Sequence, residues 1–384
     1  MSIAQRGTHA KETVRRLWGI WAKGVVAAAL ILSLVQGLPR RLVVIGPPQA
    51  VVTRNPKIGV HTRLTDEVEP WKVQRTFEMV REMGSPWAVE YFPWGYYEPQ
   101  PGRYRWEHPD LVVAHATAQG ITLLARIDFV PEWARPKETT FRYLDRDHWE
   151  DYAAFVQAFA ERYGSRVPYI IVWNEPNLSF EWGYRPPDPE AYTGLLCLTY
   201  ARVKAARPDV QILAAGLAPT LEPEGSALGM SDLLFLERMY EHGAGACFDG
   251  LAIHAYGLTS PPDDPPDPQA LNFRRAELLR AIMVAHGDAE KPCFITEGGW
   301  NDHPRWARAV RPYQRIEYTL GAYQWALEHW DWCRAVCLWV FRYPWDQHTY
   351  QDYYSFVTAD FIPKPVYMEV ANYAHGRPLE FLEP

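Results

Sequence analysis

Two glutamates in this sequence each lie one residue beyond a run of apolar residues, where a buried strand would end. Glu175 comes after Ile170–Trp173 and Asn174 in the stretch IVWNEPN, and Glu297 comes at the end of the apolar run in CFITEGGW. Two carboxyl groups can cleave a glycosidic bond when one donates a proton to the leaving oxygen and the other attacks or stabilises the anomeric carbon. The pair therefore predicts glycosidic chemistry, provided that the fold brings the two side chains together.

Eight short apolar runs alternate with longer helical stretches along the chain. Near-continuous apolar strands separated by helices indicate parallel pairing with both faces of the sheet covered. Eight such units predict an α/β fold in which a single closed (β/α)8 TIM barrel occupies residues 57–384. No Gly-rich phosphate loop follows the first run, which argues against an open doubly wound sheet. The strands are expected at Lys57–Thr62, Trp87–Phe92, Ile121–Asp128, Tyr169–Trp173, Val210–Gly216, Gly250–Tyr256, Pro292–Glu297 and Ala335–Phe341.

The barrel gives a reason for polar residues at strand ends. In barrels of this type the C-terminal ends of the strands face the active site. Glu175 ends the fourth expected strand and Glu297 ends the seventh. These strands lie across the barrel mouth from each other, so we expect the two side chains to converge.

The sequence resembles the retaining (β/α)8 glycoside hydrolases of clan A, which include cellulase-like and β-xylosidase-like families. The resemblance covers about residues 57–375 and rests on Asn174-Glu175-Pro176 and on Glu297 in TEGG. It implies that Glu175 is the acid/base and Glu297 the nucleophile of a double displacement on β-linked O-glycosidic bonds. It leaves the sugar, and exo or endo action, open.

The same resemblance implies roles for four more positions. It implies that Asn174 binds the sugar 2-hydroxyl and that Tyr256, in IHAYG, hydrogen-bonds the nucleophile. His254 is expected to contact the substrate or the acid/base, and Trp339, in CLWVF, to form the floor of the cleaved-sugar subsite. An ordinary core position is the alternative for His254 and Trp339.

The sequence departs from the clan at the arginine that many members carry on an early strand. Arg126 on the third expected strand, or Arg63 after the first, could take that role. Glu90 is a candidate third carboxylate for sugar hydroxyls. Aromatic residues cluster after the expected strands, and Trp94 and Trp300 among them are expected to stack on sugar rings.

The composition favours a carbohydrate partner and argues against others. The net charge of −7 disfavours nucleic acid, and 17 Trp with 14% aromatic residues suit stacking on sugar rings. We expect no cofactor and no metal, because His61 is the only histidine near the end of the first strand and no His-x-His motif is present. Transglycosylation and a non-catalytic carbohydrate-binding barrel remain alternatives. The sequence does not indicate an oligomeric state.

The N-terminus has a different character. Basic residues flank the apolar run Gly24–Leu38, a pattern typical of an export signal or membrane anchor. Residues 1–40 are therefore expected to place the protein outside the cytoplasm, secreted or anchored, with 41–56 as a connector; a buried core helix is the alternative. The five cysteines show no disulfide framework and are interpreted as small buried apolar residues.

Overall fold

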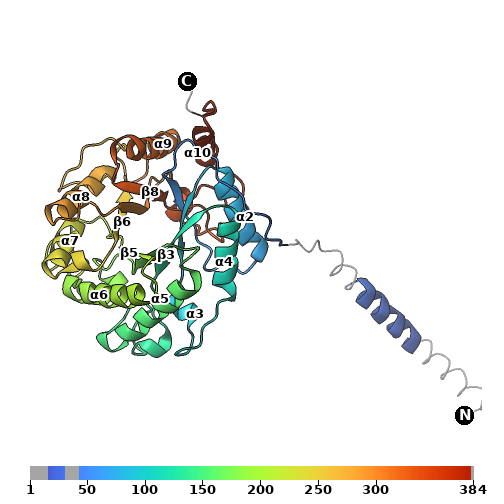
Figure 1. Ribbon diagram of the computed structural model, residues 1–384. Coiled ribbons are helices and arrows are strands. Elements are labelled where there is room, and N and C mark those ends of the chain that lie inside the picture. Colours follow the sequence, from blue (N-terminus) through green and yellow to red (C-terminus); the bar gives the residue numbers. More distant parts are fainter. Residues whose placement is uncertain (1–15, 31–42, 382–384) are drawn as a thin grey trace, which may run out of the picture. The chain divides into compact units, whose positions relative to one another are not determined.

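Eight parallel strands close into one barrel, as the sequence predicts. The computed structural model describes residues 16–30 and 43–381, and each strand from β1 to β8 pairs with its neighbours in chain order, with β8 returning to β1. Figure 1 shows the strands at the centre with the helices around them. The strands are β1 (Ile58–His61), β2 (Trp87–Tyr91), β3 (Thr122–Ile127), β4 (Tyr169–Val172), β5 (Gln211–Ala214), β6 (Gly250–Tyr256), β7 (Cys293–Gly299) and β8 (Cys333–Leu338).

Both faces of the barrel strands are buried, which is why the strands appear in the sequence as unbroken apolar runs. Alternate residues point to opposite faces of a strand. One set fills the barrel interior, and the other packs against the helices in a larger core. The interior set contains Val89, Leu124, Ile171, Leu213, Ala252, Phe294, Ala335 and Cys337.

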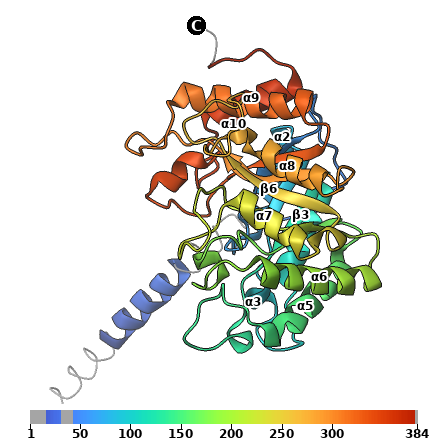
Figure 2. The ribbon, with the colours of Figure 1, turned by 90° about the vertical axis from the view of Figure 1, so that its left-hand side faces the viewer.

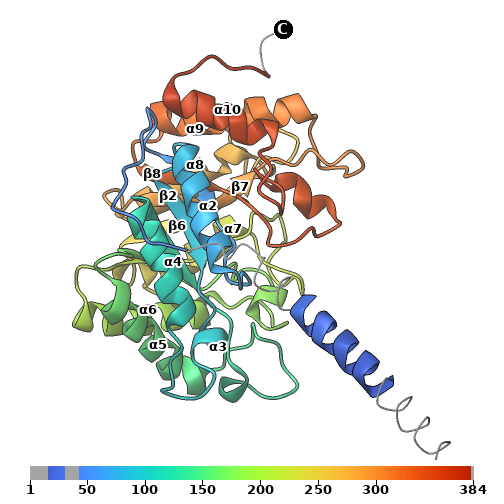
Figure 3. The same cartoon turned by 90° about the vertical axis from the view of Figure 1, so that its right-hand side faces the viewer.

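Helices cover the outside of the barrel. Neighbouring helices lie side by side, such as α5 and α6 in Figure 2 and α9 and α10 in Figure 3. The helices are α2 (Pro70–Glu82), α3 (Trp94–Tyr97), α4 (Glu107–Ala118), α5 (Trp149–Tyr163), α6 (Pro189–Ala206), α7 (Asp232–Glu241), α8 (Ala276–Ala285), α9 (Pro312–His329) and α10 (Pro365–His375).

A buried arginine anchors the loop that precedes α8. Arg275 is only 2% exposed and forms an ion pair with Asp232 at 2.8 Å. The same guanidinium donates to the carbonyl groups of Asp267, Pro268 and Ala270. These bonds engage the backbone before α8 and hold it as a loop.

The interpretation of all five cysteines as unpaired is wrong for two of them. Cys197 in α6 and Cys247, just before β6, form a disulfide with Cα atoms 4.7 Å apart. They are 50 residues apart in the sequence, so no local spacing marks the pair. Cys293, Cys333 and Cys337 are buried free cysteines, as expected.

The chain separates into two units, Met1–Val44 and Ile45–Pro384. In the first unit, residues 16–30 form a helix, and the rest of the expected apolar segment lies outside the described residues. No helix in the described ranges is long and apolar enough to cross a membrane. In the second unit, part of the expected connector is hydrogen-bonded to the barrel, since Gln49 N donates to Ala118 O and Arg54 N to Ala374 O.

Candidate active site

The chain leaves β4 in an unusual backbone conformation that presents Glu175. Trp173 and Glu175 both have positive φ angles, 76° and 42°. Such angles cost roughly 1–3 kcal/mol each in a non-glycine residue and persist only where the surroundings impose them. Here Trp173 N donates to Ile127 O, and Glu175 N donates to Gly216 O at 3.0 Å. The fully buried Asn177 fixes the following turn by bonding to backbone groups of the loop after β5.

A register shift in β7 directs Glu297 to the barrel mouth. Ile253 pairs with Ile295, but the next residue of β6, His254, pairs with Glu297. Thr296 is therefore the extra residue of a bulge, a feature that re-aims side chains next to active sites. Glu297 does not end β7 as expected, because the strand continues for two residues to Gly299.

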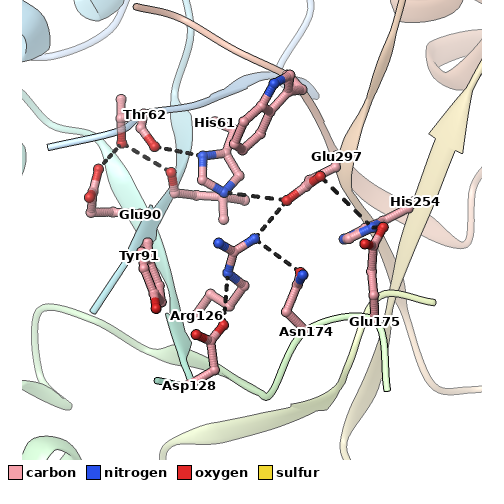
Figure 4. Close-up of polar contacts among 12 residues, drawn as sticks. His61, Thr62, Glu90, Tyr91, Arg126, Asp128, Asn174, Glu175, His254 and Glu297 are labelled. Atoms are coloured by element: carbon pink, nitrogen blue, oxygen red, sulfur yellow. Dashed lines mark hydrogen bonds and ion pairs between the residues drawn. The ribbon is translucent and has the colours of Figure 1, made fainter. Parts of the chain in front are cut away.

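The two glutamates converge around His254, as Figure 4 shows. His254 Nδ1 lies 2.8 Å from Glu175 Oε1 and 3.9 Å from Glu297 Oε2. One carboxyl oxygen of each glutamate and the His254 nitrogen all lie within 4.8 Å of one another. Burial lowers the pKa of His254, but the charge of Glu297 and the hydrogen bond with Glu175 outweigh it and raise this pKa above its usual value. His254 therefore retains a positive charge between the carboxylates to a higher pH than a free histidine.

Arg126 binds Glu297 directly. It lies two residues after the inward-pointing Leu124, so its side chain also enters the barrel. Its Nη1 donates to Glu297 Oε1 at 2.6 Å and to Asn174 Oδ1 at 3.0 Å (Figure 4). Arg63, the other arginine considered, lines the same cavity but forms its ion pair with Asp66 at 3.7 Å.

Tyr256 and Trp339 also face this region. Tyr256 Oη donates to Glu297 Oε2 at 2.9 Å. The Trp339 indole donates to Tyr343 Oη at 2.9 Å, and its ring lies edge-on to His61 at 4.6 Å. Thus six of the expected residues gather around one point: Asn174, Glu175, Glu297, Arg126, Tyr256 and Trp339 all line one cavity. His254 is 4% exposed and lies between the two glutamates. The catalytic and binding roles of these residues stay predictions.

The cavity holds about 370 Å³, within the range of small-molecule sites. Sequence reasoning missed several of its lining residues. Arg142 and Glu181 come from the loops after β3 and β4, and the rings of Trp306, Tyr350 and Tyr354 come from the loops after β7 and β8. The sequence predicts that these loops lie on the catalytic face, but it does not indicate in which direction a charged or aromatic side chain within a loop points.

Glu90 does not lie in this cavity, contrary to expectation. Its neighbour Val89 points into the barrel, so Glu90 points to the other face. Its carboxylate accepts from Thr62 Oγ1 at 2.5 Å and from Leu64 N at 3.0 Å, and the residue is 1% exposed (Figure 4). Glu90 therefore anchors the loop after β1.

Trp94 and Trp300 are also placed differently from the expectation that they stack on sugars. Both are at most 2% exposed. The Trp94 indole donates to Glu98 Oε2 at 2.6 Å, and the Trp300 indole donates to Ser260 O at 2.8 Å. Their rings pack inside the catalytic-face loops and support them.

A larger hollow of about 610 Å³ lies on α8 and α9. Its lining includes Trp325 and Trp330, but its one carboxylate, Glu277, already accepts hydrogen bonds from both indoles and from Arg274. It lacks paired carboxylates, so we place the candidate active site at the smaller cavity.

Glu175, His254 and Glu297 could also hold a metal ion on geometric grounds. Their donor atoms are already engaged, however. His254 bonds Glu175, while Arg126 and Tyr256 each occupy an oxygen of Glu297. A divalent cation would have to displace these bonds beside a buried guanidinium, so the donor set fits a carboxylate pair better than a metal site.

Comparisons with known proteins show the fold. No family model matches the chain, and no curated protein matches it. Among solved structures, a family 39 glycoside hydrolase from Bacteroides cellulosilyticus WH2 superposes with a TM-score of 0.67 at 22% identity, covering 86% of this chain. This chain spans 65% of the length of that structure.

Two further structures are similar over most of the chain. A GH39 β-xylosidase from Caulobacter crescentus has a TM-score of 0.59 at 18% identity and covers 85% of this chain and 72% of its own. A GH5_18 structure from Streptomyces cattleya in complex with GlcNAc has a TM-score of 0.62 at 16% identity, covering 84% and 80%. The (β/α)8 fold of the clan A resemblance is thereby confirmed.

Proposed function

We propose that this protein is a retaining glycoside hydrolase that cleaves β-linked O-glycosidic bonds of oligo- or polysaccharides. The observation that carries the proposal is the close approach of the two glutamates, since a carboxyl oxygen of one lies within 4.8 Å of a carboxyl oxygen of the other. Retaining enzymes keep their carboxyl groups about 5–5.5 Å apart, whereas inverting enzymes need about 6.5–9.5 Å to admit a water molecule. The glycoside hydrolases among the structural neighbours support the same reaction class.

The contacts support a different role for each carboxylate. Glu297, held by Arg126 and Tyr256, attacks the anomeric carbon while Glu175 donates a proton to the leaving oxygen. Glu175 then takes a proton from water, which releases the sugar from Glu297. His254 orients Glu175 through its 2.8 Å bond. Because Asn174 Oδ1 accepts from Arg126, its amide NH2 is left as the donor for the sugar 2-hydroxyl.

The test is a screen of the 384-residue chain on aryl β-glycosides and β-linked oligosaccharides. Because one neighbour is a β-xylosidase and another is bound to GlcNAc, β-xylosides and β-glycosides containing N-acetylglucosamine come first in the panel. Glu297→Gln should abolish turnover of every substrate. Glu175→Gln should lose about 10²–10⁴-fold on poor leaving groups and much less on good ones, since only poor ones need a proton donor.

NMR of the first-formed product then distinguishes the two stereochemical outcomes. The β anomer is expected to appear first. An initial α anomer would exclude the retaining mechanism, and unchanged activity in both variants would exclude the carboxylate pair.

We also propose that the folded part lies outside the cytoplasm, attached through or released from its N-terminal segment. Disulfides persist mainly in oxidising compartments, and Cys197 and Cys247 form one. The helix of residues 16–30 exposes Trp18 and Trp21 at 74% and 77%. Cell fractionation together with a thiol-labelling test for the disulfide checks this, and a reduced protein found only in the cytosol would contradict it.

A further inference from the structure

A chain of buried charges leads from Glu297 to a third carboxylate in the cavity. Arg126 bonds Glu297 and lies 3.4 Å from Asp128. Asp128 pairs with Arg142 at 2.5 Å, and Arg142 Nε lies 2.9 Å from Glu181 Oε2. The five side chains are at most 14% exposed, so water screens these pairs only weakly.

Glu181 has the position of a substrate-binding group. It lies in η3 (Phe180–Trp182), on the same loop as Glu175, and lines the same cavity. Among the described residues its ion-pair partner is Arg142 alone, which contacts one of its two oxygens. Burial raises the pKa of Glu181 to about 7, with Arg142 opposing the shift and Glu175 adding to it. A carboxyl group in this condition can accept or donate a hydrogen bond near neutral pH.

The cavity has two unlike sides. Arg142 and Glu181 form a charged side from the loops after β3 and β4. Trp306 and Tyr350 form an aromatic side from the loops after β7 and β8, with their rings stacked 4.6 Å apart. The charged side therefore includes the loop that carries the proton donor, and the aromatic side is formed by the loops after the strand of the nucleophile and the next strand.

The reaction determines which part of the substrate meets the charged side. The anomeric carbon must lie against Glu297, and the leaving oxygen must lie against Glu175. A leaving sugar bonded through that oxygen extends past Glu175 toward the rest of its loop. Its hydroxyl groups would there meet a carboxyl group and a guanidinium, which are matching acceptors and donors.

We propose that Glu181, held in place by Arg142, binds hydroxyl groups of the leaving sugar and so selects carbohydrate over aryl leaving groups. The inference rests on the proposed function, since it needs a glycosidic bond to be cleaved between Glu175 and Glu297. An aryl group offers no such hydroxyls, so it makes no use of this contact.

The test compares Glu181→Gln with the wild type on two substrates that share a glycon, a β-linked disaccharide and the 4-nitrophenyl β-glycoside. For the disaccharide we expect kcat/KM to fall about 10- to 100-fold, the usual effect of losing hydrogen bonds to a charged group. For the aryl glycoside we expect a change below about twofold. The methyl β-glycoside is measured as well, because its leaving group needs a proton from Glu175, as the disaccharide's does, but carries no hydroxyl groups. Its kcat/KM should also change by less than about twofold, and a loss equal to that of the disaccharide would show that Glu181 acts through Glu175 and would overturn the inference. Glu190→Gln is the matched control, because it removes the same charge from an exposed site, the second residue of α6.

Glu181→Asp is a second variant that preserves the charge facing Arg142 but withdraws the carboxylate from the cavity. It should show the same selective loss, and melting temperatures show whether each variant is folded. Equal losses on both substrates, or no loss on either, would overturn the inference while leaving the proposed function intact. A wild-type chain that hydrolyses no glycoside in the panel would overturn both.

Discussion

Gly216 leaves the space that the ring of His254 occupies. A Cβ atom at position 216 would lie 2.3 Å from both Cδ2 and Nε2 of His254. Carbon atoms in contact normally lie about 3.5–4.0 Å apart. In Gly216→Ala the ring must therefore retreat by about 1.2 Å or more, because the backbone of Gly216 is itself held by its bond from Glu175 N.

The bond between His254 and Glu175 cannot keep its present geometry after such a shift. The edge that clashes, Cδ2–Nε2, lies opposite Nδ1 in the ring, and Nδ1 bonds Glu175 Oε1 at 2.8 Å, so the ring and the Glu175 carboxyl group must move relative to each other. A hydrogen bond to a charged group contributes about 1.5–3 kcal/mol. Since His254 orients the proton donor, we expect kcat/KM to fall about 10- to 150-fold in Gly216→Ala.

Kinetics on a glycoside with a poor leaving group measure this effect. Gly46→Ala is the control, because a Cβ there meets no atom within 4 Å. In the double variant Gly216→Ala/His254→Ala the added methyl group has no ring to displace. Its kcat/KM should therefore be no lower than that of His254→Ala alone. Activity of Gly216→Ala within twofold of wild type, in a folded protein, would refute the steric argument.

Three further results are expected. Burial raises the pKa of Glu90 to about 7, above its unfolded value, so the native state binds the extra proton. The free energy of unfolding should then fall by about 3 kcal/mol as the pH rises from about 4.5 to 7, and Glu90→Gln should flatten that slope in denaturant titrations. Replacing Cys197 and Cys247 with serine removes a cross-link over 50 residues and should lower the unfolding free energy by about 4 kcal/mol, whereas an unchanged denaturation midpoint would show that the bond is not formed. Prolonged treatment with a chelator should leave glycosidase activity unchanged, and recovery of lost activity by added Zn²⁺ or Mn²⁺ would instead establish a metal site.

The sequence by itself determined the architecture and the two central residues. The apolar runs lack an alternation of apolar and polar residues, which indicates parallel strands buried on both faces. Eight such strands separated by helices predict a closed (β/α)8 barrel. Glu175 and Glu297 stand out because an ionisable residue at the end of an apolar strand is costly to bury without a purpose. Tyr256 and His254 were expected from the resemblance to clan A, and they lie two residues apart on one face of β6.

Only the tertiary structure decided which neighbours these residues meet. The bulge at Thr296 pairs Glu297 with His254. Arg126 lies on the face of β3 that points into the barrel and can bond Glu297, whereas Glu90 lies on the outward face of β2. Register shifts and parity depend on pairing between strands far apart in the sequence, so no local pattern reveals them. Glu181 and the Cys197–Cys247 bond were hidden for the same reason, because the direction of a loop side chain and the meeting of distant cysteines are set by closure of the barrel.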